Sequence, residues 1–495
     1  MKTRVRFAPS PTGPLHMGGV RTALYNYLYA KQNGGDFIIR IEDTDSHRFV
    51  PGAEKYIIDS LRWCGIIPDE GVDAEGNVVQ TPSERHPHAP YRQSERRGIY
   101  RKYAEQLVES GFAYYAFDSA AELDAKRAEA EAAGKTFIYN HETRGSLRNS
   151  LTLPQSEVSA LLESASDWTV RFKMPVGRIV EMDDMIRGHV EVCTDTLDDK
   201  VLWKRADELP TYHLANIVDD HLMEITEVIR GEEWLPSLPL HYLLYEAFGW
   251  QRPQFAHLPL LLKPVGNGKL SKRDGDKMGF PVFPLNWTTA EGETYHGYRE
   301  DGYFPEAFVN LLAMLGWNPG TEQEIFSMQE LIDSFSIERV SKSGAKFNPE
   351  KAKWYNKEYL RACPEQKLAE LYMSVLKEKG IETSLEYVQK CVAVLKERAT
   401  FVQDFWTIAP YLFIAPSEYN EKDTTKFGEF KAQAVEACRA GFAGLEDYIR
   451  AREWPMGKVM NCIRLALTGN ASGLAIADIV GLIGEKEALR RVEAL

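Results

Sequence analysis

The 495 residues of the chain are too many for a single hydrophobic core, so we expect roughly three to five domains. Apolar residues make up 44% of the chain, enough to fill such cores, which excludes a chain that is disordered throughout. The formal net charge of −13 argues against nonspecific nucleic-acid binding over the whole surface, although it leaves room for a local basic face.

Short-range patterns disfavour two further classes of protein. No uninterrupted apolar run approaches the roughly 20 residues that cross a bilayer, and the first residues enter a strand pattern without the layout of a signal peptide. We therefore expect a cytoplasmic protein without membrane contact. The six cysteines include no CxxC pair, and His86 and His88 lack further ligands nearby, so we expect reduced thiols and no metal centre.

The chain begins with the pattern of a β-α-β unit. Residues 4–8 suit a short strand, residues 16–32 have helical spacing, and residues 36–41 form the nearly continuous apolar run typical of a buried parallel strand. This order predicts a doubly wound α/β sheet. Further amphipathic helices are predicted at 54–65 and 97–111.

The composition then changes. Residues 120–134 are rich in Ala, Glu and Lys and predict a solvated helix, whereas residues 169–175 alternate as a half-buried strand. We expect a separate α+β domain inserted into the first. A sheet-type pattern resumes at 211–229, and after about Asp301 the chain is almost wholly helical.

The expected fold is a Rossmann-type α/β catalytic region, interrupted by the insertion and followed by an all-α C-terminal half. The predicted domain bounds are 1–115, 116–205, 206–300, 301–370 and 371–495.

A turn rich in Pro and Gly joins the first strand to its helix, and it reads Ala8-Pro9-Ser10-Pro11-Thr12-Gly13-Pro14-Leu15-His16-Met17-Gly18-Gly19. A helix that begins beside a strand end presents unpaired backbone N–H groups and the positive end of its dipole to an anion. Gly13 would permit the turn, Gly18 and Gly19 would let a base or ribose approach, and His16 could donate to phosphate oxygens. For the glycines alone, an ordinary turn before a helix remains the alternative.

A lysine motif, Lys269-Leu270-Ser271-Lys272-Arg273, follows an apolar strand and a loop that contains Gly266 and Gly268. In isolation such a motif could be a solvated charge run. As a mobile loop hinged at the glycines, it would neutralise charge that develops on a polyphosphate. Together, the two motifs predict a site that binds ATP and directs attack on its α-phosphate.

The two motifs resemble the HIGH and KMSKS signatures of class I aminoacyl-tRNA synthetases. Further segments resemble glutamyl-tRNA synthetases, and the similarity extends over essentially the whole chain; these segments are residues 6–13, 40–45, 91–96, 210–216 and 230–234.

The resemblance implies a glutamate site. Arg6 with Tyr212 would face the side-chain carboxylate and Arg230 the α-carboxylate, since arginine binds carboxylates with two parallel hydrogen bonds. Glu42 would take the ammonium group. Taken singly, these residues could instead form surface ion pairs or a helix cap. The implied glutamate-binding residues are Arg6, Ser10, Glu42, Tyr212, Asn216 and Arg230.

The resemblance also implies an ATP site with His16, Lys269 and Lys272 as the catalytic residues. The glutamate α-carboxylate would attack the ATP α-phosphate to give glutamyl-adenylate and pyrophosphate, and a terminal ribose hydroxyl of tRNA would then take the glutamyl group. Magnesium would be carried by the ATP phosphates, because no protein cage for it is evident. The implied ATP-binding residues are Pro9, Gly13, His16, Gly18, Gly19, Glu233, Lys269, Ser271, Lys272 and Arg273.

Two features depart from the family pattern. Some relatives carry a zinc site that begins with Cys-x-Cys, but the corresponding residues here are Tyr115-Ala116-Phe117, so we expect no zinc. The segment 274–293 is longer than expected and lies beside the lysine motif. Two roles remain for this segment: it rests on the tRNA stem, or it restrains the lysine loop.

The helical C-terminal half favours this family over bacterial glutaminyl relatives, whose anticodon region is built from β-barrels. Arg398 and Arg464 are candidates for reading the anticodon, with exposed helix arginines as the alternative. Trp354 is a further tRNA candidate, although a packed side chain at the domain junction suits it better.

The resemblance implies a monomeric glutamate–tRNA ligase acting on tRNA(Glu), L-glutamate and ATP. Three alternatives remain: an enzyme that also charges tRNA(Gln), an idle RNA-binding protein and a simple nucleotidyltransferase.

Overall fold

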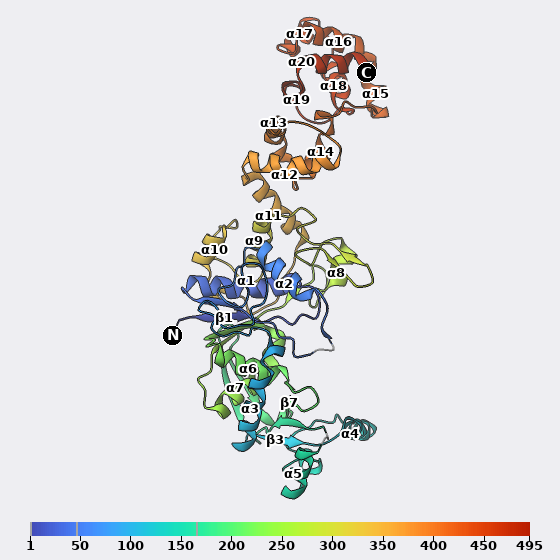
Figure 1. Ribbon diagram of the computed structural model, residues 1–495. Coiled ribbons are helices and arrows are strands. Elements are labelled where there is room, and N and C mark those ends of the chain that lie inside the picture. Colours follow the sequence, from blue (N-terminus) through green and yellow to red (C-terminus); the bar gives the residue numbers. More distant parts are fainter. Residues whose placement is uncertain (1, 46–47, 165–166) are drawn as a thin grey trace. The chain divides into compact units, whose positions relative to one another are not determined.

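The computed structural model describes residues 2–45, 48–164 and 167–495 (Figure 1). The chain divides into two compact units, of which the first comprises residues 1–301 and 308–349 and the second residues 302–307 and 350–495. The first unit is mixed α/β and the second is helical, which agrees with the predicted fold class.

The first unit begins with the predicted β-α-β arrangement. Strand β1 (Arg4–Phe7) pairs in parallel with β2 (Asp36–Ile39), and helix α1 (Met17–Gln32) connects them. Both strands are almost wholly buried, as the continuous apolar run predicts for β2, whereas β1 also buries the side chains of Arg4 and Arg6. In Figure 1, α1 lies above β1, whereas α6 and α7 lie below it.

A four-stranded sheet continues this layer. Its order is β6-β5-β10-β9, formed by Gly188–Cys193, Ile179–Asp184, Gln254–Leu258 and Glu227–Gly231. Strand β10 is parallel to β5 and β9, and the Thr226 amide donates to the Arg4 carbonyl at 2.9 Å, which places the start of β9 beside β1. The carboxyl ends of β1, β2 and β9 therefore meet at one edge, where α/β proteins bind their ligands.

A second sheet is antiparallel, with the order β3-β4-β7-β8, formed by Ala113–Ala116, Thr169–Phe172, Val201–Lys204 and Leu209–Pro210. Helix α4 (Ala120–Ala132) buries none of its residues, as its composition predicted, and α5 (Gln155–Glu163) buries only Val158. Strands β5 and β6 lie within the same stretch of sequence but belong to the other sheet, where β6 pairs with β5 and β5 pairs with β10.

The sheet-type pattern predicted at 211–229 is wrong for its first part. Residues Tyr212–Leu222 form helix α6, which precedes β9. Every residue from Leu214 to Asp220 is buried, so the apolar spacing that would identify one face of a helix is lost.

The other elements of the first unit surround these sheets. They are α2 (Ala53–Trp63), α3 (Arg97–Glu109), α7 (Leu238–Phe248), α8 (Lys272–Met278), α10 (Met328–Ser334), β11 (Leu261–Leu262), β12 (Trp287–Thr288), β13 (Thr294–Tyr295) and β14 (Ala345–Lys346). Helix α9 (Pro305–Met314) contributes residues to both units.

The helical unit packs apolar faces around buried residues such as Tyr372, Val392 and Leu465. Its helices are α11 (Pro349–Ala362), α12 (Glu365–Glu378), α13 (Leu385–Leu395), α14 (Asp404–Ile408), α15 (Glu421–Phe427), α16 (Lys431–Ala440), α17 (Leu445–Ala451), α18 (Met456–Thr468), α19 (Ile476–Ile483) and α20 (Glu485–Ala494).

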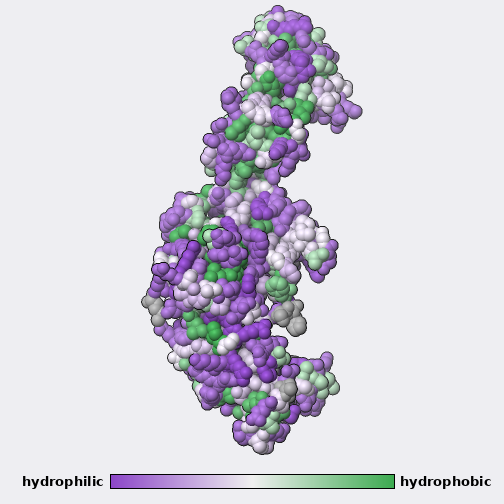
Figure 2. All heavy atoms as spheres, in the orientation of Figure 1, coloured by the Kyte–Doolittle hydropathy of each residue, from purple (hydrophilic) through white to green (hydrophobic). Residues whose placement is uncertain are grey.

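The face of the molecule shown in Figure 2 is mostly hydrophilic, and the first unit is hollowed between the regions of α8 and α4. Within the described ranges, no helix is both long and apolar enough to span a bilayer.

Candidate active site

The first backbone amides of helix α1 are already hydrogen-bonded to other groups of the protein. The Met17 amide donates to the Val282 carbonyl at 2.9 Å, and the Gly18 amide donates to His16 Nδ1 at 3.2 Å. The amides of Gly19 and Val20 donate to the His16 carbonyl. The expectation of unpaired amides at this helix start is therefore wrong, and polar side chains must supply most of the donors at this site.

His16 is the N-cap of α1, and its ring presents one nitrogen for other partners. Because Nδ1 accepts from Gly18, the ring proton is assigned to Nε2, which is buried without a partner among the described residues. Burial, together with the charge of Lys269, lowers the pKa of His16 to about 4. Near neutral pH, His16 is therefore an uncharged donor.

Gly19 is the more tightly packed of the two adjacent glycines. A Cβ atom at this position would come within 2.5 Å of Leu15 Cδ1, and Leu15 is itself buried. A Cβ on Gly18 would meet nothing closer than 3.7 Å. The two adjacent glycines therefore differ in their roles, and the close approach lies at the second.

The lysine motif follows β11 through a tight turn. Gly266 and Gly268 have φ values of 77° and 115°, a region that favours glycine, and the Leu270 amide returns to the Leu261 carbonyl at 2.7 Å. Ser271 then caps α8 in a reciprocal contact with Asp274. Lys269 Nζ lies 3.6 Å from a carboxylate oxygen of Glu233, with both side chains about half exposed.

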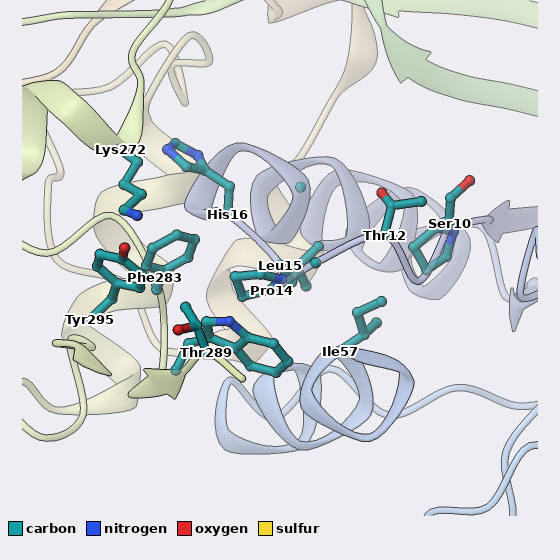
Figure 3. Close-up of a pocket in the computed structure, with 14 residues that line it drawn as sticks. Ser10, Thr12, Pro14, Leu15, His16, Ile57, Lys272, Phe283, Thr289 and Tyr295 are labelled. Atoms are coloured by element: carbon teal, nitrogen blue, oxygen red, sulfur yellow. The ribbon is translucent and has the colours of Figure 1, made fainter. Parts of the chain in front are cut away.

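Lys272 has an aromatic partner. Its Nζ lies 3.1 Å from the ring centroid of Tyr295, within the range of a cation–π contact. In Figure 3 the Lys272 side chain extends toward the Tyr295 ring, beside the ring of His16.

Lys272, Tyr295 and His16 line a cavity of about 520 Å³, here called the motif cavity. The turn of the first motif also lines it, through residues that include Pro9, Ser10 and Gly13.

A second cavity, of about 980 Å³, adjoins the first and is here called the arginine cavity. Residues shared by both linings are Pro9, Ser10, Thr12 and Gly19. The arginine cavity is lined by all six residues predicted to bind glutamate, Arg6, Ser10, Glu42, Tyr212, Asn216 and Arg230, and also by Glu233.

One end of the arginine cavity is held by a buried charge network. Arg6 donates through Nε and Nη2 to the two carboxylate oxygens of Asp220, each at 3.0 Å. Arg40 joins Asp220 to Glu42, with donor–acceptor distances of 2.8 and 3.0 Å. Asn216 donates to the same Glu42 oxygen at 3.2 Å. The network fixes Arg6 and Glu42 before any ligand binds.

The charges in this network shift one another's pKa values. Burial would raise the pKa of Asp220, but Arg6 and Arg40 outweigh it, so that pKa lies below the ordinary value. Burial would likewise lower the pKa of Arg6, which Asp220 reverses. For Glu42 burial dominates and raises the pKa, although Arg40 opposes this. A cationic group beside Glu42 would favour its ionised form.

The other arginine of the cavity is held by neutral groups. Arg230 Nε donates to His257 Nε2 at 3.0 Å, and Nη1 donates to the Tyr212 hydroxyl at 2.9 Å. His257 Nδ1 in turn lies 2.6 Å from Asp184, which fixes the ring proton on Nδ1. Two arginines and a carboxylate that line one cavity can hold a ligand that carries two carboxylates and one ammonium.

The structure places most predicted site residues at these two cavities. Lys269 lines neither cavity but contacts Glu233, which lines the arginine cavity. Gly18, Ser271 and Arg273 also line neither cavity. The three tRNA candidates belong to the second unit. Arg464 lines a cavity of about 680 Å³ there, Arg398 is exposed, and Trp354 is half-buried under Lys351, whose Nζ lies 3.9 Å from its ring centroid.

Sequence reasoning did not assign a role to Arg40, His257 or Asp184, since these residues meet only in the fold. Asp219 and Asp220 interrupt an apolar stretch, where an unpaired buried carboxylate would be costly. Both are paired in the fold: Asp219 accepts from Arg96 at 2.7 Å and from Tyr100 at 2.8 Å, and Asp220 accepts from Arg6 at 3.0 Å.

No group of three or more His, Cys, Asp or Glu side chains suited to a metal ion occurs within residues 2–45, 48–164 and 167–495. All six cysteines are free thiols, and four of them are buried.

Comparison with known proteins matches both parts of the chain. Residues 2–354 match the family of class I tRNA synthetases (E and Q), catalytic domain, and residues 367–495 match an anticodon binding domain. Glutamate–tRNA ligases from Flavobacterium psychrophilum and Bacteroides thetaiotaomicron are each 53% identical to this chain, over 99% of it and 98% of their own length.

Solved structures agree. A glutamate tRNA ligase from Elizabethkingia meningosepticum, in complex with its amino acid, has a TM-score of 0.94 at 51% identity and covers 100% of this chain and 99% of its own. The glutamate–tRNA synthetase of Elizabethkingia anophelis has a TM-score of 0.92 at the same identity and coverage. The chain therefore belongs to the class I aminoacyl-tRNA synthetases, and within them to the glutamate–tRNA ligases.

Proposed function

We propose that the arginine cavity is the glutamate site of this ligase and that the motif cavity receives the phosphates of ATP. One observation carries the proposal: two arginines, each oriented by buried partners, line one cavity together with Glu42, and this cavity shares lining residues with the one that His16 and Lys272 line. This arrangement suits an amino acid with two carboxylates and presents its α-carboxylate near a phosphate site.

Each group of glutamate then has a partner. Arg6 with Tyr212 binds the side-chain carboxylate, and Arg230 binds the α-carboxylate. Glu42, assisted by Ser10, binds the ammonium, and Asn216 holds Glu42 in place at 3.2 Å. A buried carboxylate whose pKa is raised by burial gains an ionic partner when the ammonium arrives.

Activation then needs no covalent enzyme intermediate. An oxygen of the glutamate α-carboxylate attacks the α-phosphorus of ATP, a new P–O bond forms, and the bond to the bridging oxygen breaks as pyrophosphate leaves. His16 donates through Nε2, and Lys269 and Lys272 balance the negative charge that develops on the phosphates. A terminal ribose hydroxyl of tRNA(Glu) then attacks the adenylate carbonyl and AMP leaves.

Magnesium is proposed to bind to the ATP phosphates, and the site side chains near them are basic rather than acidic. The inserted region is proposed to work without zinc, because Tyr115, Ala116 and Phe117 offer no thiolate ligand. Metal analysis of the purified protein tests this, and about one zinc per chain would contradict it.

We further propose that the chain works as a cytoplasmic monomer whose five predicted domains have separate roles. Residues 1–115 and 206–300 form the catalytic halves, 116–205 receive the acceptor end, 301–370 contact the stem, and 371–495 bind the anticodon. Burial raises the pKa of the Tyr411 hydroxyl and the charges of Arg398 and Arg464 both oppose this, so the two arginines proposed to read the anticodon lie in one region of the helical unit.

The decisive experiment is aminoacylation with ATP and L-glutamate, using purified tRNA(Glu) and tRNA(Gln) in parallel. Charging of tRNA(Glu) alone is expected. Charging of both would establish an enzyme that does not discriminate between them, and charging of neither would leave only an idle RNA-binding or nucleotidyltransferase role. Pyrophosphate exchange with and without tRNA, run beside it, tests whether activation waits for tRNA.

A further inference from the structure

The segment from Phe280 to Tyr298, here called the docked hairpin, contains β12 and β13 and directly follows the lysine motif and α8. It overlaps the stretch that is longer than the family pattern leads one to expect. Val282, Phe283 and Leu285 are buried, so the segment packs against the body of the first unit.

The docked hairpin is tied to the first motif. The Val282 carbonyl accepts from the Met17 amide, the first backbone donor of α1, at 2.9 Å. The Phe283 ring meets the ring of His16 edge-on, with centroids 6.0 Å apart at 80°. The hairpin therefore contacts both the cap and the first amide of the helix that carries the motif.

A second anchor comes from helix α2. The Tyr56 hydroxyl donates to the Leu285 carbonyl at 2.5 Å and accepts from the Leu285 amide at 3.2 Å. Its ring also contacts Trp287 edge-on, with centroids 5.2 Å apart at 84°. Helices α1 and α2 of the first unit thus both contact the first half of the docked hairpin.

The far strand of the hairpin carries Tyr295, and this ring holds Lys272. The Lys272 Nζ lies 3.1 Å from the ring centroid, and the Tyr295 hydroxyl is itself hydrogen-bonded to Glu293. Phe283 packs against Tyr295 from within the hairpin, with centroids 6.1 Å apart. A chain of contacts therefore runs from His16 through Phe283 and Tyr295 to Lys272 (Figure 3).

We propose that Tyr295 is a positioning residue for glutamate activation: its ring holds the Lys272 ammonium in the motif cavity beside His16, and the docked hairpin fixes that ring relative to helix α1. The inference rests on the proposed function, since it assumes that Lys272 acts on the ATP phosphates.

The geometry indicates that the Tyr295 ring positions the Lys272 ammonium for phosphate rather than withholding it from phosphate. An ammonium that rests on an aromatic face keeps N–H donors on the side away from the ring, so it can still bind phosphate oxygens. A carboxylate partner would compete with phosphate for the same donors, whereas an aromatic ring does not. Holding a flexible lysine side chain in advance also removes part of the entropy cost of ordering it in the transition state.

The test is tRNA-dependent pyrophosphate exchange by the full chain. Tyr295→Leu should lower kcat by about three- to tenfold, the size of a partly exposed cation–π contact, with little change in the KM for glutamate. Tyr295→Phe keeps the ring and should stay within about twofold of the unmodified chain. Thr294→Val, an exposed neighbour on β13, serves as the matched control.

A double variant separates positioning from a structural effect. In a Lys272→Ala background, Tyr295→Leu should cause no further loss of kcat, because its effect acts through the lysine. An equal loss in both backgrounds would overturn the proposal, as would a Tyr295→Leu variant that is faster than the unmodified chain, which would indicate sequestration. If the unmodified chain fails to activate glutamate, the proposed function fails instead.

Discussion

Arg6 and Arg230 of the arginine cavity are each held in place by a buried side chain, Asp220 and His257 respectively. Arg6 uses Nε and Nη2 on Asp220, which leaves Nη1 outside that contact, and Arg230 rests its Nε on His257. An arginine held in this way loses little side-chain freedom when a carboxylate binds. Under the proposed function, substrate specificity would depend also on Asp220 and His257, which hold the two arginines.

Replacing the planar guanidinium of Arg230 should weaken glutamate binding. Arg230→Lys keeps the charge but loses the fork that can contact His257 and a carboxylate together, so we expect the KM for glutamate to rise by about tenfold to a hundredfold, as for one or two charge-assisted hydrogen bonds. The measurement is pyrophosphate exchange over a range of glutamate concentrations. Arg178→Lys, at an exposed pair with Glu246, is the control and should leave KM unchanged.

His16 should stay neutral across the working pH range. Its pKa of about 4 in the folded chain lies below its ordinary value of 6.5, so between these two values the unfolded chain binds a proton that the folded chain does not. His16 therefore costs no stability above pH 6.5 and lowers stability as the pH falls from 6.5 toward 4. Side-chain NMR, assigned with a His16→Gln variant, should show no titration of His16 between pH 8 and about 5.5; a midpoint near 6.5 would contradict the burial argument.

At the scale of elements, helix α6 links the charge network to the fold. It carries Asp219 and Asp220, both buried, and its neighbours in space supply the positive charges. Because α6 is buried, its two carboxylates need charged or hydrogen-bonding partners. Burial on all sides also removes the apolar period that would predict a helix from the sequence.

Asp220→Asn should destabilise the first unit strongly. Removing one partner of a buried ion pair costs about 3–5 kcal/mol, and here Arg6 and Arg40 would both lose a charge-balancing contact. Urea unfolding followed by tryptophan fluorescence measures the loss. Glu246→Gln breaks the exposed pair with Arg178 and should cost less than about 1 kcal/mol; equal losses in the two variants would refute a buried network.

The elements that could be predicted from sequence are those whose pattern is local. Helix α1 and strands β1 and β2 were predicted from the local pattern of apolar residues. The resemblance to a known family grouped Arg6, Glu42 and Arg230, and these three residues line one cavity, whereas their binding roles stay predictions. Helix α6 was not predicted, because burial on all sides removes the apolar period of its sequence. The amide of Met17 was expected to be free, and it pairs with Val282 through a contact that no local pattern encodes.

At the scale of the whole molecule, catalysis and anticodon reading are assigned to different units. Arg398→Ala should therefore raise the KM for tRNA while leaving the KM values for glutamate and ATP unchanged, because the first unit alone lines both substrate cavities. Aminoacylation kinetics with each substrate varied in turn measure this. Arg439→Ala, an exposed arginine of the same unit paired with Glu493, is the control, and an equal rise in its tRNA KM would remove Arg398 from the anticodon assignment.

The contact between Gly19 and Leu15 bears on which positions of the first motif can change together. A Cβ atom on Gly19 would come within 2.5 Å of Leu15 Cδ1, so a larger residue at this position requires the Leu15 side chain to shift or to be replaced by a smaller one. Positions 15 and 19 should therefore vary as a pair, whereas a Cβ on Gly18 would meet nothing closer than 3.7 Å and that position can vary alone.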